Sequence, residues 1–135
     1  MENADPGALP VIRIGADELT PSDPTPGMSR SMAMHDAGMW TGVVDTEAGS
    51  VSGWHHHGEH ETTLYVVHGR MRIESGPGGS IVVEGGPGDF LRVPAGAIHR
   101  ESNPGGEPAR AVIVRCGPRH GAGEPTINVE APAPD

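Results

Sequence analysis

Short apolar runs, separated by glycine and proline, occupy the chain between residues 40 and 116. Residues 70–74 alternate Arg, Met, Arg, Ile and Glu, which is the pattern of a strand with one buried face. Residues 62–68 are rich in β-branched side chains and end at Gly69. We expect core strands at residues 39–44, 50–57, 62–68, 70–74, 81–83, 90–93, 97–102 and 109–116.

No segment carries a 3.6-residue apolar stripe of helical length, and only residues 17–19 suggest a single helical turn. Seven or eight short strands with turns between them are typical of a β-sandwich or a small closed barrel. The sequence therefore predicts an all-β domain with little or no helix, at residues 36–118.

The two ends of the chain differ from this core. Residues 1–35 contain five prolines, which oppose helix formation, and we expect an irregular N-terminal arm with one edge strand at residues 11–14. Residues 119–135 are expected to form a C-terminal tail, in which residues 126–129 are a further short strand.

The glycine and proline content needs an explanation, because it can also indicate disorder. The 135-residue chain has 21 glycines and 14 prolines. The regular runs of Val, Ile, Leu and Tyr between these residues favour turns within a folded domain, since a disordered segment would lack such runs. The chain length fits one domain.

The charge balance excludes several partners. The net charge is −9, from 18 acidic and 9 basic residues, and no run of Lys or Arg is present to bind phosphates. We therefore expect neither nucleic acid nor a membrane as partner. The N-terminus lacks the features of a secretory signal, and Cys116 is the single cysteine, which together favour a cytoplasmic location.

A cluster of histidines carries the candidate chemistry. Four of the eight histidines lie within residues 54–61. Because residues i and i+2 of a strand share a face, His55 and His57 are expected to point together, with His56 and Trp54 turned away. Two imidazoles on one face can share a metal ion, and a third ligand must come from elsewhere in the fold.

A second segment supplies that ligand and reveals a resemblance to the cupin family. The second cupin motif is G-x5-P-x-G-x2-H-x3-N, and the first begins G-x5-H-x-H. The residues that match the second motif are Gly88, Pro94, Gly96, His99 and Asn103. The residues that match the first are Gly49, His55 and His57. The resemblance implies a cupin-like jelly-roll β-barrel, built as a double sheet, with His99 as a metal ligand.

The first motif departs from the family pattern where the family usually places a glutamate. Counting forward from His57 gives Glu61, but counting back from Gly69 gives Thr62, a poor metal ligand. Glu61 reaches the metal through a bulge, or the acidic ligand is absent, or His60 supplies a fourth ligand. We take Glu61 as the candidate ligand and expect His60 to lie at the surface.

The metal and a second acidic residue complete the expected site. Imidazoles with one carboxylate suit Fe(II), Mn(II), Ni(II), Zn(II) or Cu(II), and we expect one divalent transition-metal ion, with Fe, Mn, Ni and Zn as the candidates. Glu101 shares a strand face with His99, as in the pirin branch of cupins, and is the candidate catalytic residue, as a base or a further ligand. Cys116, Tyr65 and Phe90 are expected to fill the core.

The resemblance also limits the function. Cupins include dioxygenases, isomerases, polyketide cyclases and binding modules, so the fold does not name the reaction. We expect a metal-dependent enzyme that acts on a small organic substrate, by dioxygenase-like or polyketide-cyclase-like chemistry. The alternative is a non-catalytic module that binds a small ligand or senses the metal. The resemblance further implies a homodimer, in which the N-terminal arm adds a strand to the partner.

Overall fold

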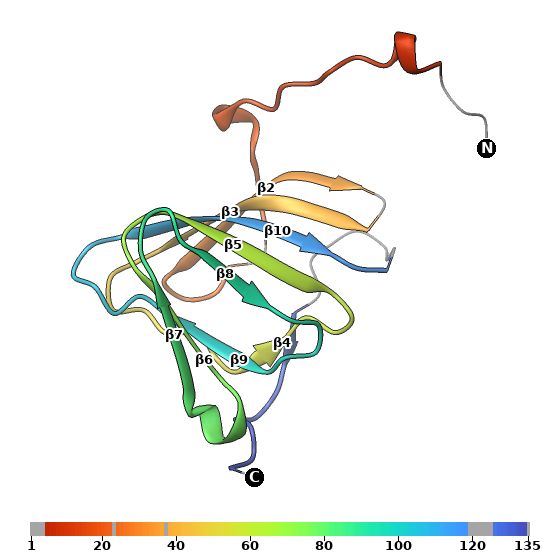
Figure 1. The fold of residues 1–135 in the computed structure, drawn as a ribbon. Helices are drawn as coiled ribbons and strands as arrows, with labels where there is room; N and C mark the ends of the chain where they lie inside the picture. Colours follow the sequence, from red (N-terminus) through yellow and green to blue (C-terminus); the bar gives the residue numbers. More distant parts are fainter. Residues whose placement is uncertain (1–4, 23, 37, 119–125, 135) are drawn as a thin grey trace.

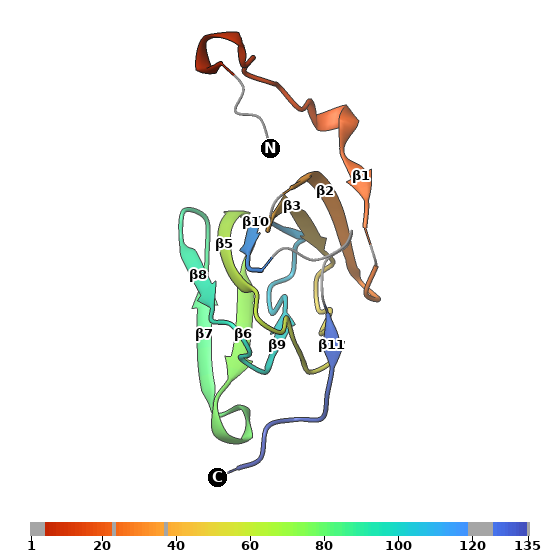
Figure 2. The same ribbon diagram turned by 90° about the vertical axis from the view of Figure 1, so that its right-hand side faces the viewer.

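Two β-sheets pack face to face as a sandwich (Figures 1 and 2) in the computed structural model, which describes residues 5–22, 24–36, 38–118 and 126–134. The larger sheet contains, in order, β1 (Thr20–Pro21), β2 (Met28–Asp36), β3 (Met39–Thr46), β10 (Ala109–Cys116), β5 (Glu61–His68) and β8 (Phe90–Val93). The smaller sheet contains β11 (Ile127–Asn128), β4 (His55–His56), β9 (His99–Ser102), β6 (Met71–Ser75) and β7 (Ile81–Gly85). All strand pairs are antiparallel.

The all-β prediction is confirmed, and the barrel is corrected to a sandwich. Among the strands that the structure describes, each belongs to one sheet, and no ladder of hydrogen bonds joins the sheets into a ring. Within the described part of the chain, the helical segments are three 3-10 turns, η1 (Pro6–Ala8), η2 (Ala16–Glu18) and η3 (Pro77–Gly79). None of the described helices is long or apolar enough to cross a membrane.

The N-terminal third differs from the expected irregular arm. The prolines end at Pro26, and the proline-free segment after them forms β2, which pairs with β3 along its length. Residues 11–14 form no strand, because this stretch runs away from both sheets (Figure 1) and meets no neighbouring strand. The predicted strand at residues 50–57 shortens to β4. Of the predicted C-terminal tail, residues 119–125 lie outside the described residues.

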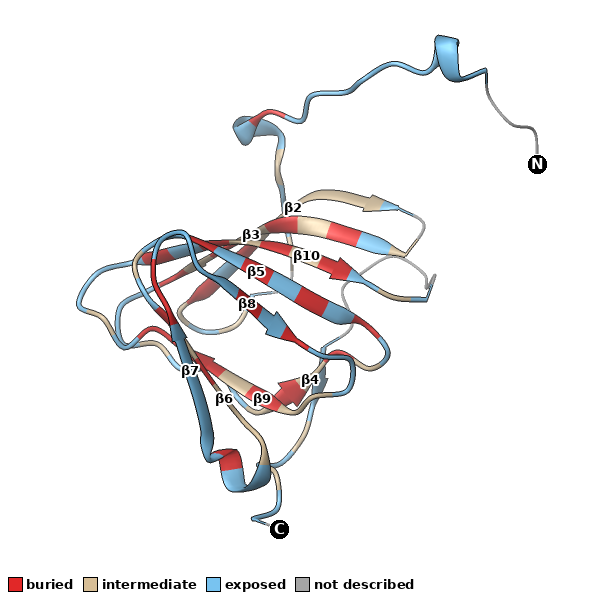
Figure 3. Cartoon of the chain, viewed as in Figure 1, coloured by how far each residue is buried: buried red, intermediate tan, exposed pale blue. Residues whose placement is uncertain are grey.

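Alternation along the strands separates the core from the surface, as the colours of β5 show in Figure 3. The even-numbered residues of β5 from Thr62 to Val66 face inward, so Leu64 and Val66 are buried while Tyr65 is 40% exposed. The buried apolar side chains are Met28, Trp40, Val44, Leu64, Val66, Met71, Ile73, Leu91, Val93, Ala109, Ala111 and Ile113. They come from both sheets and form one cluster between them.

Three residues that we expected in the core lie outside it. Phe90 is 70% exposed, and its ring centroid lies 4.9 Å from that of Tyr65 on the outer face of the larger sheet. Cys116 is also exposed. The reason is strand parity: on β10 the inward positions fall on Ala109, Ala111 and Ile113, so the next inward side chain is that of Arg115.

Asn103 ties the loops at one end of the sandwich together. Its buried amide donates hydrogen bonds to the carbonyl oxygens of Thr46 (3.2 Å) and Glu107 (2.7 Å), and its side-chain oxygen accepts one from the Gly105 amide (3.0 Å). One side chain therefore satisfies three backbone groups after β9, next to the strand that carries His99.

Replacement of Asn103 by alanine is expected to lower the free energy of unfolding by about 2–4 kcal/mol, because these backbone groups lose their partner. Urea unfolding followed by circular dichroism measures the change. The control is Asn128→Ala, at an exposed position of β11, with an expected change within about 0.5 kcal/mol. Equal effects of the two substitutions would show that Asn103 does not brace the loops.

Candidate metal site

Four buried side chains converge between the sheets: those of His55, His57, His99 and Glu101. One ligand atom from each, a ring nitrogen or a carboxylate oxygen, lies within 4.8 Å of the others. The centroids of the three imidazole rings are 4.3–5.2 Å apart. The three histidines predicted from spacing are therefore brought together, with Glu101 as the fourth member of the group.

The backbone pairing of β4 with β9 explains this convergence. His55 and His99 are directly opposite each other in the ladder, so their side chains lie on the same face. His57 follows His55 by two residues, and Glu101 follows His99 by two residues on β9, so both return to that face. The neighbouring strands β4 and β9 of the smaller sheet (Figure 1), together with the residue that follows β4, thus supply all four groups.

Backbone carbonyls orient two of the rings. The Nδ1 atom of His55 lies 2.9 Å from the carbonyl oxygen of Gly53, and Nδ1 of His99 lies 2.9 Å from that of Ala97. Because a carbonyl accepts, each Nδ1 donates its proton there, and Nε2 is the ring atom that faces the group: it can donate to Glu101 when it is protonated and offers a lone pair to a metal when it is not. Metal-bound histidines in proteins usually donate the N–H of the other ring nitrogen to a backbone carbonyl or a carboxylate in this way.

Glu101 adds a negative charge at the centre of the group. Its Oε1 atom lies 3.3 Å from Nε2 of His99 and 3.5 Å from Nε2 of His55. Burial alone would raise the pKa of this carboxyl, but the contacts with the two histidines and the charge of Arg30 outweigh burial and hold the pKa well below its usual range. The side chain is therefore an anion across the neutral pH range.

The donor set fits a divalent transition metal. Three imidazoles and one carboxylate are the ligand types that such ions prefer. Nε2 of His55 is fully buried, and among the described residues its polar neighbour is the Glu101 carboxylate at 3.5 Å, too long for a good hydrogen bond, which is costly for a polar atom unless a ligand engages it. A metal at the centre of the four groups would satisfy this atom.

The position of Glu61 differs from the expectation that it is a ligand. Glu61 begins β5 with its side chain on the outer face, 52% exposed, and accepts a hydrogen bond from the Arg92 guanidinium at 3.0 Å. The next residue, Thr62, is the one that points inward. The first motif therefore places Thr62, and not Glu61, at the inward position, and no bulge turns Glu61 toward the three histidines.

Two other histidines of the segment are also placed. His60, expected at the surface, is buried, and its ring lies against Gly117, where a Cβ atom would come within 2.6 Å of it. His60 is not among the four converging groups. His56 turns away, as expected, and its Nδ1 accepts a hydrogen bond from the Gly58 amide (3.0 Å).

Sequence reasoning missed Arg115, which lies beside the site. Its Nε atom donates to Thr62 Oγ1 at 2.8 Å, and one terminal nitrogen lies 3.5 Å from Nε2 of His57. The alternation along β10 was the available signal, since it places residue 115 inward. By contrast, Arg92 and Arg100 face outward, where Arg100 pairs with Glu74 at 2.9–3.0 Å.

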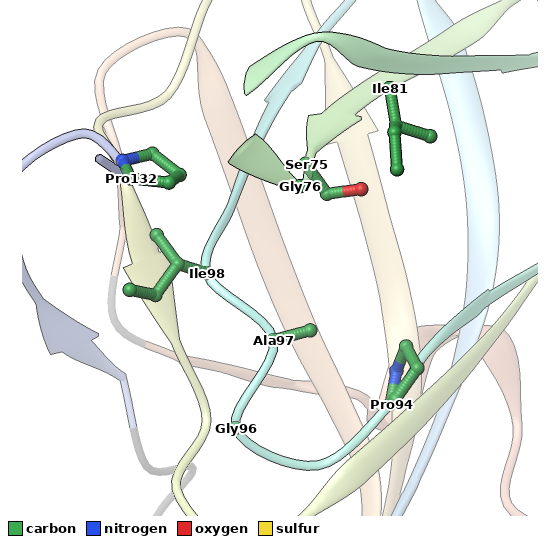
Figure 4. A pocket seen from close by; sticks show the side chains of 8 residues that line it. All are labelled: Ser75, Gly76, Ile81, Pro94, Gly96, Ala97, Ile98 and Pro132. Carbon is green, nitrogen blue, oxygen red and sulfur yellow. The ribbon is translucent and has the colours of Figure 1, made fainter. Parts of the chain in front are cut away.

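An apolar pocket of about 420 Å³ lies behind the loop that leads to β9 (Figure 4). Its lining side chains include Ile81 from β7, Pro94 and Ala97 from the loop, and Pro132 from the tail. Ala97 is also the residue whose carbonyl oxygen orients His99. The pocket wall and the orientation of one histidine thus depend on the same loop.

Comparisons with known proteins agree with this architecture. A family model described as the cupin domain matches residues 42–115. No curated protein sequence matches the chain. Among solved structures, KdgF from a Halomonas species is 26% identical, with a TM-score of 0.67 over 83% of this chain and 97% of that chain.

Two further solved structures show the same fold at lower identity. A protein with a double-stranded β-helix domain from Klebsiella pneumoniae is 24% identical, with a TM-score of 0.63 over 80% of this chain and 91% of that chain. A sugar phosphate isomerase from a cupin superfamily of Silicibacter pomeroyi is 21% identical, with a TM-score of 0.65 over 78% and 75%. At these identities the similarity concerns the fold alone.

Proposed function

The chain belongs to the cupin superfamily, and from this premise we propose that it is a metal-dependent enzyme for a small organic substrate bound between its sheets. The observation that carries the proposal is the buried group of three imidazoles and one carboxylate. His55, His57 and His99 hold the metal through their ring nitrogens. The metal is Fe, Mn, Ni or Zn, all of which accept such ligands.

Glu101 is the fourth ligand in this proposal. A general base works best when its pKa lies near the working pH, whereas the pKa of Glu101 is held well below the usual range of a carboxyl. An ionised carboxylate with such a low proton affinity is better suited to bind a cation. Of the two roles that the sequence suggested for Glu101, base and ligand, we therefore propose that of ligand, and the role of base stays a prediction.

Four protein ligands would leave positions for substrate or water on an ion that takes six ligands, and a bound ion would supply Lewis acidity or, if redox-active, oxygen chemistry. Nδ1 of His55 and of His99 stays engaged by backbone carbonyl oxygens, which fixes both rings before substrate enters. Burial of all four groups excludes bulk water from the reacting atoms. Dioxygenase-like and polyketide-cyclase-like reactions are the two that we propose.

A turnover assay with defined metals tests the enzyme proposal. Protein loaded with Fe(II), Mn(II), Ni(II) or Zn(II) is incubated with a panel of small organic acids and polyketide-like phenols. Oxygen uptake and product masses are then measured. We expect turnover with one metal and none with His99→Ala. Tight binding of a compound without conversion under every metal would favour the non-catalytic sensing module instead.

We also propose a homodimer that uses the N-terminal arm. Residues 9–14 carry large apolar side chains on a stretch that leaves the body of the protein (Figure 2), and Val11 and Ile12 are 101% and 76% exposed. Burial of apolar side chains of an extended arm against a partner lowers the free energy of the complex. A second copy of the chain offers exposed apolar side chains at Tyr65 and Phe90 on the outer sheet face.

The double substitution of Val11 and Ile12 by glutamate is expected to convert the dimer into a monomer. Light scattering after size-exclusion chromatography measures the mass, which should fall from twice the chain mass to the chain mass of 14.0 kDa. Ala48→Glu, at an exposed loop position, serves as the control for added charge. A dimer that persists in the double variant would contradict the role of the arm.

A further inference from the structure

We propose that residues 126–134 form a C-terminal strap that positions the segment carrying His55 and His57. This role rests on the proposed function, because the strap supports two of the proposed ligands of the same metal site. Three observations support it: the short ladder between β4 and β9, the contacts of the strap with β4, and a second attachment near the end of the strap. The strap acts on the site through the backbone of β4 and does not itself contact a metal.

The strand that carries His55 receives little support from β9. β4 contains two residues, and its ladder with β9 consists of one pair, His55 with His99. Ser52, further along the chain toward the N-terminus, is still hydrogen-bonded to β9. From there the segment runs between Gly53 and Gly58, and Gly58 has a φ of +62°. A short ladder between glycines opens easily, so a further contact is needed to keep the two histidines in place.

The strap supplies that contact on the other side of β4. Its strand β11 is an outer strand of the smaller sheet (Figure 2) and runs antiparallel to β4, with Asn128 opposite His55. β4 therefore lies between β11 and β9. The amide of Val129 also donates a hydrogen bond to the carbonyl oxygen of Trp54 at 3.1 Å. Because these contacts involve the backbone, they fix the strand from which the His55 side chain projects.

A second contact attaches the far end of the strap. The amide of Gly78, in the η3 turn, donates a hydrogen bond to the carbonyl oxygen of Ala133 at 2.9 Å. The ring of Trp54 lies against the same turn, since a Cβ atom on Gly79 would come within 2.5 Å of it. The strap is therefore attached at both ends, and the η3 turn joins it to the residue that precedes His55.

The sequence of the strap suits a fixed connection. Pro132 and Pro134 alternate with alanines, and proline lowers the conformational entropy that the chain loses when it docks. Pro132 also lines the pocket in Figure 4 together with Ile98, the residue before His99. The strap thus adjoins the residues that precede two of the proposed ligands.

A strap that only adds stability makes a different prediction. In that case its release destabilises the whole domain, and amide hydrogen exchange becomes faster in every core strand alike. If the strap positions the histidines, its release frees residues 54–58 while the core strands stay protected. The exchange of residues 54–58, measured against that of β10, therefore separates the two roles.

The experiment measures amide hydrogen exchange by mass spectrometry on the full-length, metal-free protein. Val129→Pro removes the amide hydrogen that bonds to Trp54. The matched control is Val129→Ala, which shortens the same side chain but keeps the amide. The second variant, which replaces both Pro132 and Pro134 by glycine, loosens the far end of the strap and decides the question if Val129→Pro does not fold.

We expect the amides of residues 54–58 to exchange about 3- to 10-fold faster in Val129→Pro than in wild type, as the loss of one backbone hydrogen bond implies. The amides of β10 should be unchanged. Val129→Ala should match wild type, and the double glycine variant should fall between wild type and Val129→Pro. Unchanged exchange at residues 54–58 in the folded variants would overturn the proposal, as would an equal acceleration in β10.

Metal affinity separates a failure of the strap from a failure of the proposed function. Competition with a chelator measures Zn(II) binding, and we expect Val129→Pro to bind Zn(II) about 10-fold more weakly than wild type and Val129→Ala. Equal affinities would overturn the positioning role even where exchange changes. If wild type binds no Zn(II), the metal-enzyme proposal fails, whereas faster exchange at residues 54–58 still supports the strap and unchanged exchange still overturns it.

Discussion

Substitution of His99 by alanine is expected to remove stoichiometric metal from the protein. The Nε2 atom of His99 lies at the centre of the buried group, within 3.3 Å of Glu101 Oε1. Loss of an outer hydrogen-bond partner of a ligand already lowers metal affinity by about 10- to 100-fold, so loss of the ligand itself should exceed that. Elemental analysis of untagged protein measures the metal per chain, and His55→Ala should behave in the same way.

The matched control is His56→Ala. His56 lies between two proposed ligands in the sequence, but its side chain turns away and accepts a hydrogen bond from the Gly58 amide. This variant should retain the metal content of wild type, with at most a small loss of stability. If wild type, His99→Ala and His56→Ala all carry the same substoichiometric metal, the four residues do not form a metal site.

The second large effect is expected for Glu101→Gln, which should lower the affinity for a divalent metal by at least about ten-fold. The substitution keeps the size of the side chain but removes the negative charge that faces the two buried guanidiniums of Arg30 and Arg115. Competition with a chelator of known affinity measures the change. Circular dichroism checks that the variant remains folded.

Glu61→Gln is the control that decides between the two glutamates. Glu61 is exposed and paired with Arg92, so its replacement should leave the metal affinity unchanged. Loss of affinity in Glu61→Gln with none in Glu101→Gln would show that the first-motif glutamate is the ligand after all. The two variants therefore test whether Glu101 or Glu61 is the acidic ligand of the metal.

The histidine spacing and the family resemblance were sufficient to predict which three imidazoles lie close together. The positions i and i+2 of His55 and His57 depend only on the pleat of a strand, and that relation holds locally without knowledge of the fold. The position of His99 followed from the resemblance, and the pairing of β4 with β9 brings His55 and His99 opposite each other. The alternation of the core strands predicted the all-β class for the same local reason.

The faces on which individual side chains lie, and the presence of β2, depended on strand parity and on long-range packing. Glu61 and Thr62 differ by one position, and a shift of one residue moves a side chain to the opposite face of a sheet. The same parity turned Cys116 outward and Arg115 inward. The prolines before residue 27 predicted an irregular arm for residues 1–35, whereas residues 28–36 form β2 because they pair with β3. Composition alone cannot reveal such pairing.

Anomalous diffraction from a crystal of metal-loaded protein tests the central claim most directly. Data collected above and below the absorption edge of the added metal locate the ion independently of any assumed ligands. We predict one peak per chain, bound by His55, His57, His99 and Glu101. A peak at Glu61 or at a surface histidine, or no peak among the four buried groups, would contradict the metal site proposed for this protein.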